Sequence, residues 1–89
     1  MELRAMTLSE YEEYLKELNT WIEQQKKGDI QVYEVGLKAQ KWIAEKVYKI
    51  DPYTVRPGVL KKMADKTVDL TEQEEDKDEK NSVTSGNGE

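Results

Sequence analysis

The sequence predicts an all-α protein: a small three-helix domain over residues 1–70, followed by a disordered acidic C-terminal tail over residues 71–89. Three observations support this fold class. Apolar residues recur at three- and four-residue steps in three segments, which is the pattern of helices with one buried face. Glycine or proline stands between these segments. From Thr71 onward, Val83 is the one large apolar side chain, which is too little to offset the entropy lost on ordering.

The first helix is expected to begin at Leu8 and to end before Gly28. Thr7 and Glu10 form a Thr-x-x-Glu capping box, in which each side chain accepts a hydrogen bond from the backbone N–H of the other residue. A glycine directly after a helix is a common stop signal. The predicted buried face comprises Leu8, Tyr11, Leu15, Leu18 and Ile22, and is broadened by Tyr14 and Trp21.

Residues 29–36 allow two interpretations. Asp29 could cap a helix that starts here, or the segment could form a short extended piece that ends at Gly36. The next helix is expected to end near Asp51, because a residue before proline is disfavoured in the α region. A second helix is therefore predicted over residues 37–50, from the spacing of Leu37, Ile43, Val47 and Ile50.

The third helix follows two prolines. Asp51 and Pro52 are suited to open a single helical turn, with Asp51 at the cap and Pro52 at the first helical position. Pro57 and Gly58 then interrupt the chain again. A third helix is predicted over residues 57–70, from the spacing of Val59, Leu60, Met63, Thr67 and Leu70.

The residue composition argues against an enzyme. The chain has no histidine and no cysteine, the groups on which general acid–base and nucleophilic catalysis most often depend. The acidic run over residues 72–79 lacks the turn glycine and the closing glutamate spacing of an EF-hand calcium loop. We expect no catalytic residue, no cofactor and no metal site.

Nothing in the sequence indicates a membrane protein. Residues 1–6 lack the apolar stretch of a signal peptide. No run of residues approaches the roughly 18 apolar residues that a membrane span requires. The absence of cysteine favours an intracellular home for so small a protein. We therefore expect a cytoplasmic protein that does not contact membranes.

Charge is distributed unevenly along the chain. Residues 1–34 carry four basic and eight acidic side chains, whereas residues 35–70 carry eight basic and four acidic ones. Residues 71–89 supply the whole net charge of −5. This tail could cover the basic segment or attract a basic partner, and the acidic parts together could imitate nucleic acid toward such a partner.

Residues 41–63, KWIAEKVYKIDPYTVRPGVLKKM, resemble the helix-turn-helix segments of winged-helix bacterial regulators. The resemblance implies that Ala44 is the small residue packed between the two helices. It implies that Thr54 and Arg56 contact phosphates or bases, and that Lys61 and Lys62 anchor the protein on the DNA backbone. A DNA-binding regulator that uses residues 41–66 is therefore the alternative function.

The sequence departs from that family at three points. Pro57 and Gly58 directly follow Arg56, where the recognition helix should continue. Tyr48 stands where the family often has its turn glycine, and a bulky residue adopts a positive φ only at a cost. No β-hairpin wing follows Leu70.

The aromatic residues support the leading function, a non-catalytic protein-interaction module. Three short helices are not expected to cover two tryptophans and five tyrosines completely, and exposed aromatics are frequent interface hot spots. Trp21, Trp42 and Tyr14 are the predicted partner-binding residues, in an apolar groove between the first two helices. Self-association through the same residues is also open. In size and composition the chain resembles small accessory proteins of bacteriophages, such as assembly chaperones and inhibitors of host proteins.

Overall fold

The computed structural model describes residues 2–73, which form three α-helices and one short 3₁₀ helix. No strand occurs among these residues, so the predicted all-α, three-helix fold is confirmed. The predicted tail lies outside the described residues from residue 74 onward. In chain order the elements are α1 (Leu8–Lys26), α2 (Val32–Lys46), η1 (Pro52–Thr54) and α3 (Pro57–Glu72).

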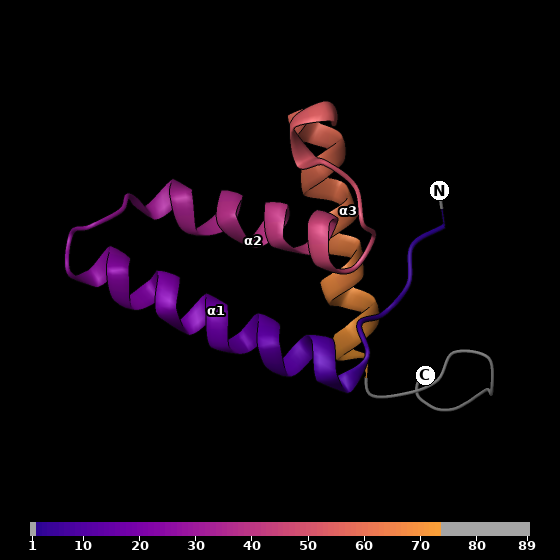
Figure 1. Cartoon of the computed structure of the whole chain (residues 1–89), viewed down its shortest axis with the longest axis horizontal. Helices are drawn as coiled ribbons and strands as arrows, with labels where there is room; N and C mark the ends of the chain where they lie inside the picture. Colours follow the sequence, from indigo (N-terminus) through magenta and orange to yellow (C-terminus); the bar gives the residue numbers. More distant parts are fainter. Residues whose placement is uncertain (1, 74–89) are drawn as a thin grey trace, which may run out of the picture.

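Figure 1 shows that α1 and α2 form an antiparallel hairpin and that α3 runs across one end of it. The crossed end is the one where α1 begins and α2 ends. α2 is the central element, because it packs against α1, against α3 and against η1. No helix among residues 2–73 is long and apolar enough to cross a membrane.

The predicted capping box at the start of α1 is confirmed. The Glu10 N–H donates to Thr7 Oγ1 at 3.2 Å, and the Thr7 N–H donates to Glu10 Oε1 at 2.9 Å. A cap of this kind stabilises a helix by about 1 kcal/mol. α1 ends at Lys26, and Gly28 then adopts a φ of 85°, which glycine tolerates without steric cost.

The predicted buried face of α1 is confirmed at Tyr11, Tyr14, Leu18 and Trp21 and is wrong at Leu8 and Leu15. Tyr14 and Trp21 are the buried residues of this helix, whereas Leu8 and Leu15 are exposed. α1 packs mainly along α2 and touches α3 through Tyr11, whose hydroxyl donates to Glu72 at 2.9 Å. The large aromatic rings occupy the packed side, because they remove more apolar surface from water than leucine does.

α2 begins earlier than predicted, since residues 32–36 belong to it. Gln31 is the N-cap residue, and its N–H donates to Glu34 Oε1 at 2.6 Å. The interpretation of residues 29–36 as an extended piece is therefore wrong. The alternative, a helix that opens in this segment, is confirmed, although its cap is Gln31 and not Asp29. The capping carboxylate comes from Glu34, within the helix itself.

α2 also ends four residues before the predicted end at Ile50. Its last residue is Lys46, and Lys49 adopts a positive φ of 59°. The chain turns here so that the Ile50 N–H donates to the Ala44 carbonyl at 3.0 Å. Ile50 thereby packs beside Ala44, Leu60 and Met63 in the core. The proline rule placed the end too late because the turn requires several residues before Pro52.

The predicted single turn and third helix are both present. Asp51 Oδ1 accepts a hydrogen bond from the Tyr53 N–H at 3.0 Å and so caps η1, with Pro52 at its first position. α3 begins at Pro57 as predicted and extends to Glu72, two residues beyond the predicted end. Thr71 remains in the helix, where its Oγ1 accepts a hydrogen bond from the Met6 N–H at 2.8 Å.

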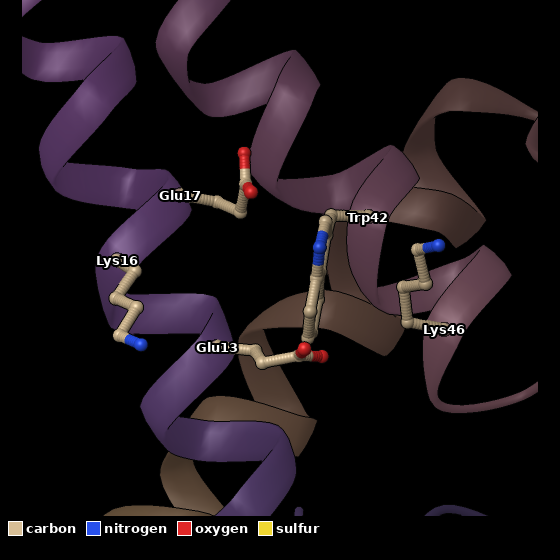
Figure 2. Close-up of a pocket in the computed structure, with 5 residues that line it drawn as sticks. All are labelled: Glu13, Lys16, Glu17, Trp42 and Lys46. Atoms are coloured by element: carbon tan, nitrogen blue, oxygen red, sulfur yellow. The ribbon is translucent and has the colours of Figure 1, made fainter.

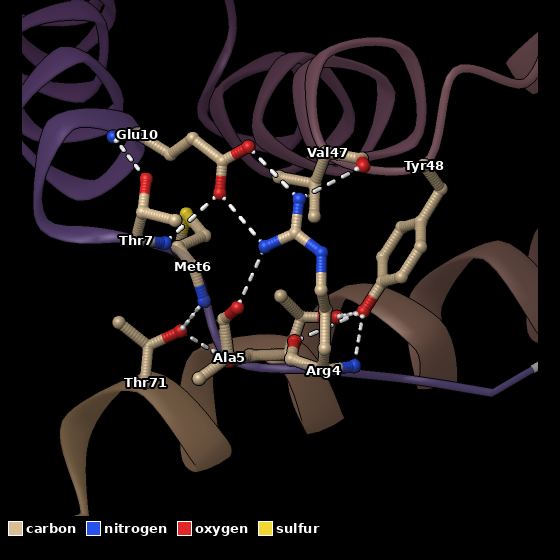
Figure 3. A network of polar contacts seen from close by, with 9 residues as sticks. Arg4, Ala5, Met6, Thr7, Glu10, Val47, Tyr48 and Thr71 are labelled. Carbon is tan, nitrogen blue, oxygen red and sulfur yellow. Dashed lines mark hydrogen bonds and ion pairs between the residues drawn. The ribbon is translucent and has the colours of Figure 1, made fainter.

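The N-terminal segment ties the three helices together (Figure 3). The Arg4 guanidinium donates to both carboxylate oxygens of Glu10 at 2.9 Å and to the Val47 carbonyl at 3.2 Å. The Tyr48 hydroxyl contacts the Arg4 backbone and lies 2.6 Å from Thr67 Oγ1 of α3, which is fully buried. Arg4 holds the pKa of Glu10 at about 2, mainly through these hydrogen bonds.

Candidate interaction surface

The connection between α2 and α3 displays an exposed aromatic side chain, Tyr53. Its backbone is fixed, since Asp51 caps the turn and Pro52 is buried beneath it. The Tyr53 ring is 77% exposed. Lys41 of α2 donates from Nζ to the Tyr53 hydroxyl at 3.0 Å and lies 5.3 Å from the ring centroid. This contact holds the ring beside α2.

Tyr53 forms one side of a hollow of about 350 Å³, which we call the α2–η1–α3 hollow. Leu60 is buried in the core, whereas Leu37 is 41% exposed, so the hollow extends from the core to solvent. Except for Lys41 and the Tyr53 hydroxyl, its side chains are apolar. The lining residues are Leu37, Lys41, Pro52, Tyr53, Val55, Pro57 and Leu60.

The local sequence makes this hollow rigid. Pro52 and Pro57 have fixed φ angles and lack a backbone N–H that would otherwise need a partner. The Thr54 hydroxyl donates to the Asp51 carbonyl at 2.7 Å and holds the turn closed. The hollow is therefore formed before any partner arrives, which reduces the entropy cost of binding.

The predicted partner-binding residues lie elsewhere, in the core. Trp21 and Trp42 are each 9% exposed and Tyr14 is 7% exposed, so these three are not among the exposed aromatic side chains. The expectation that some aromatics stay uncovered is confirmed at Tyr33 and Tyr53 instead. The antiparallel hairpin brings Tyr14 and Trp42 together, with ring centroids 5.7 Å apart. Partner binding by these three residues remains a prediction, and their burial assigns them a structural role first.

Trp42 also lines a smaller hollow of about 190 Å³ between α1 and α2. Figure 2 shows Glu13 and Glu17 reaching from α1 toward the Trp42 ring. Lys16 and Lys46 complete the lining. With four charged side chains at its rim, this hollow is not the apolar groove that the sequence predicts between the first two helices.

An apolar groove of about 230 Å³ does lie where the hairpin meets α3, and Tyr14 lines it. Its large apolar side chains are buried, as are Tyr14 and Ile43, or partly buried and packed against the core, as are Leu18, Val35 and Val68. The α2–η1–α3 hollow, by contrast, has two exposed apolar residues in its lining, Leu37 at 41% and Tyr53 at 77%. We therefore take the α2–η1–α3 hollow as the stronger candidate.

The four side chains that are predicted to contact DNA differ in whether they already take part in contacts within the protein. Thr54 holds the η1 turn, and Lys61 Nζ forms an ion pair with Asp65 at 2.8 Å. Arg56 occupies the N-cap position of α3 without a capping hydrogen bond from its side chain, and it is exposed, as is Lys62. Two of the four side chains are thus engaged in local structure.

The connection between α2 and α3 also differs from the turn of the helix-turn-helix motif. Ala44 is fully buried, as the resemblance to helix-turn-helix segments implies. However, residues 47–56 include the η1 turn and exceed the three- or four-residue turn of that motif. The positive φ falls on Lys49 and not on Tyr48.

Among residues 2–73, no three carboxylate, histidine or cysteine side chains are grouped so that they could hold a metal ion. Comparisons of the chain with protein-family models, with curated proteins and with solved structures found no match. The case for a function therefore depends on the residues of this chain alone.

Sequence reasoning missed Leu37, Lys41 and Tyr53 as neighbours. The spacing places Leu37 on the predicted buried face of its helix, because periodicity does not reveal how much of an apolar stripe a neighbour covers. The available signal was the segment Asp51–Pro57, in which two prolines enclose an aromatic residue. Such a segment is stiff and holds its exposed side chains in place.

Proposed function

We propose that the protein is a non-catalytic protein-interaction module that docks its partner in the α2–η1–α3 hollow. The observation that carries this proposal is an apolar hollow with the exposed residues Leu37 and Tyr53 in its lining. An apolar side chain of a partner that fills the hollow would gain about 1.5–3 kcal/mol from burial. An assembly chaperone or an inhibitor of another protein would act through such a surface.

Two further features support the proposal. Tyrosine is enriched among interface hot spots, because it offers a large surface with little side-chain entropy to lose. Tyr53 is additionally restrained by Lys41 and by the proline-flanked turn. A restrained aromatic beside an apolar hollow is suited to anchor a partner.

The experiment compares two matched substitutions. Leu37→Asp places a charge in the hollow, whereas Leu15→Asp places the same charge on α1, where leucine is similarly exposed at 43% against 41%. Affinity capture from the source cell should recover a partner with the wild type and with Leu15→Asp, but not with Leu37→Asp. Equal recovery with all three proteins would contradict the proposal. Circular dichroism checks that each variant remains folded.

A second candidate function is DNA binding through residues 41–66. It is supported by the exposure of Arg56 and Lys62 at the start of α3. DNA binding of this kind is salt-dependent and weakens when phosphate-contacting cations are removed. Fluorescence anisotropy with duplex DNA should then show a lower affinity for the Arg56→Ala and Lys62→Ala variants. An affinity unchanged by both substitutions would exclude this candidate.

A further inference from the structure

The α2–η1–α3 hollow has a size that limits its occupant. Its volume of about 350 Å³ lies at the lower end of the range for ligand pockets, about 300–1,000 Å³. It therefore accommodates one or two side chains of a partner and not a folded element. Leu37, Val55 and Leu60 require those side chains to be apolar.

The lining of the hollow has one charged side chain, Lys41. Its ammonium group has three N–H donors, and one of them is directed to the Tyr53 hydroxyl. None of the ion pairs within residues 2–73 involves Lys41. A positive charge with unused donors therefore stands beside the apolar surface.

The carboxylates close to Lys41 in the sequence either accept hydrogen bonds from other residues or form no ion pair with Lys41. Asp51 accepts a hydrogen bond from the Tyr53 N–H, and Glu34 accepts one from the Gln31 N–H. Glu45 lies one turn from Lys41 on α2 and is exposed without an ion pair to it. Among residues 2–73, Lys41 thus has no carboxylate partner, and its charge can pair with a carboxylate from another molecule.

From this arrangement we infer that the occupant of the hollow is an acidic segment of a protein partner. An apolar side chain of the segment fills the hollow, and a neighbouring carboxylate accepts hydrogen bonds from Lys41 Nζ. Charge-assisted hydrogen bonds are stronger than neutral ones, and a like charge at this position would repel a basic segment. The inference rests on the proposed function and adds the chemical class of the partner.

Two synthetic peptides test this inference against the full chain. One carries leucine and phenylalanine at every third or fourth position with glutamates between them, and the other has lysine in place of every glutamate. Both carry fluorescein, and binding is followed by anisotropy. The acidic peptide should bind, and the lysine peptide should bind at least about tenfold more weakly.

Variants of the protein then assign the charge preference to one residue. Lys41→Glu should weaken binding of the acidic peptide about tenfold, whereas Lys38→Glu, the same change on α2 outside the lining, should leave it nearly unchanged. Lys41→Gln retains a donor for the Tyr53 hydroxyl but removes the charge, and should give an intermediate loss. Equal effects of Lys41→Glu and Lys38→Glu would overturn the inference.

The remaining outcomes separate the inference from the proposed function. If both peptides bind equally and Leu37→Asp abolishes both, the hollow docks a partner but not an acidic one, and only the inference fails. If neither peptide binds, the inference fails, and the capture experiment decides the proposed function. Displacement of the acidic peptide by duplex DNA, dependent on Lys41, would make nucleic acid the occupant. If the chain forms a dimer in sedimentation experiments and Leu37→Asp dissociates this dimer, the occupant of the hollow is a second copy of the chain.

Discussion

The two faces of α2 both carry large side chains but have different surroundings. On the side of α1, Trp42 and Ile43 are buried in the main core cluster. On the other side, Leu37 and Lys41 line a hollow that η1 and the start of α3 cover only in part. The difference lies in the direction of the neighbouring helix, because α1 runs along α2 whereas α3 crosses its end (Figure 1). A face that the chain leaves partly uncovered is available to a partner.

The largest expected effect concerns the buried face. Trp42→Ala removes the ring that contacts Tyr14 and leaves a cavity in the core. We expect the free energy of unfolding to fall by about 3–5 kcal/mol, as measured by urea denaturation. A loss below about 1 kcal/mol would show that this face is not the centre of the core.

Next in size is the contact that joins α2, α3 and the N-terminal segment. Tyr48→Phe removes the hydroxyl that lies 2.6 Å from the buried Thr67 Oγ1 and that also contacts the Arg4 backbone. We expect a loss of about 0.5–1.5 kcal/mol in urea denaturation, the net value of a hydrogen bond, because Thr67 Oγ1 keeps its bond to the Met63 carbonyl at 2.7 Å. An unchanged stability would place the N-terminal segment outside the cooperative unit.

The Arg4–Glu10 contact predicts a dependence on pH. The pKa of Glu10 is lowered to about 2, so the folded state holds the ionised form and binds fewer protons than the unfolded chain. The contribution of the Arg4–Glu10 contact to the free energy of unfolding is complete above the ordinary pKa of glutamate and is lost as the pH falls toward 2. We expect about 1 kcal/mol after allowance for solvent screening at this partly exposed pair. Urea denaturation between pH 6 and pH 2 should show a smaller decrease for Glu10→Gln than for the wild type.

The smallest expected effect is at the rim of the hollow. Tyr53→Ala removes an exposed side chain, so the free energy of unfolding should change by no more than about 0.5 kcal/mol. The same substitution should reduce partner capture, because truncation of an interface anchor commonly costs more than 1 kcal/mol of binding. A destabilised variant would instead assign Tyr53 to the core.

The fold could largely be predicted because its signals are local. The Thr7 and Glu10 pattern fixed the start of α1, and Pro57 fixed the start of α3. The predicted ends of α2 are wrong, because the Gln31 cap and the turn at Lys49 depend on how the flanking residues pack. Neither is marked by one characteristic residue. Local signals determine helix type better than helix boundaries.

The candidate site could not be predicted, because exposure depends on tertiary packing. Trp21 and Trp42 stand at the edges of their apolar stripes in the sequence, yet the hairpin buries both. Leu37 stands within its stripe and remains 41% exposed. The contact between Lys41 and Tyr53 joins residues on two elements, and no spacing along one helix reveals it.

Site-specific photo-cross-linking tests the central claim most directly. A benzophenone side chain replaces Tyr53 at the hollow or, in the control, the exposed Leu15 on α1. Irradiation in the source cell should join the protein to a partner from position 53 and not from position 15. Cross-links from position 15 alone, or equally from both, would contradict docking in the α2–η1–α3 hollow.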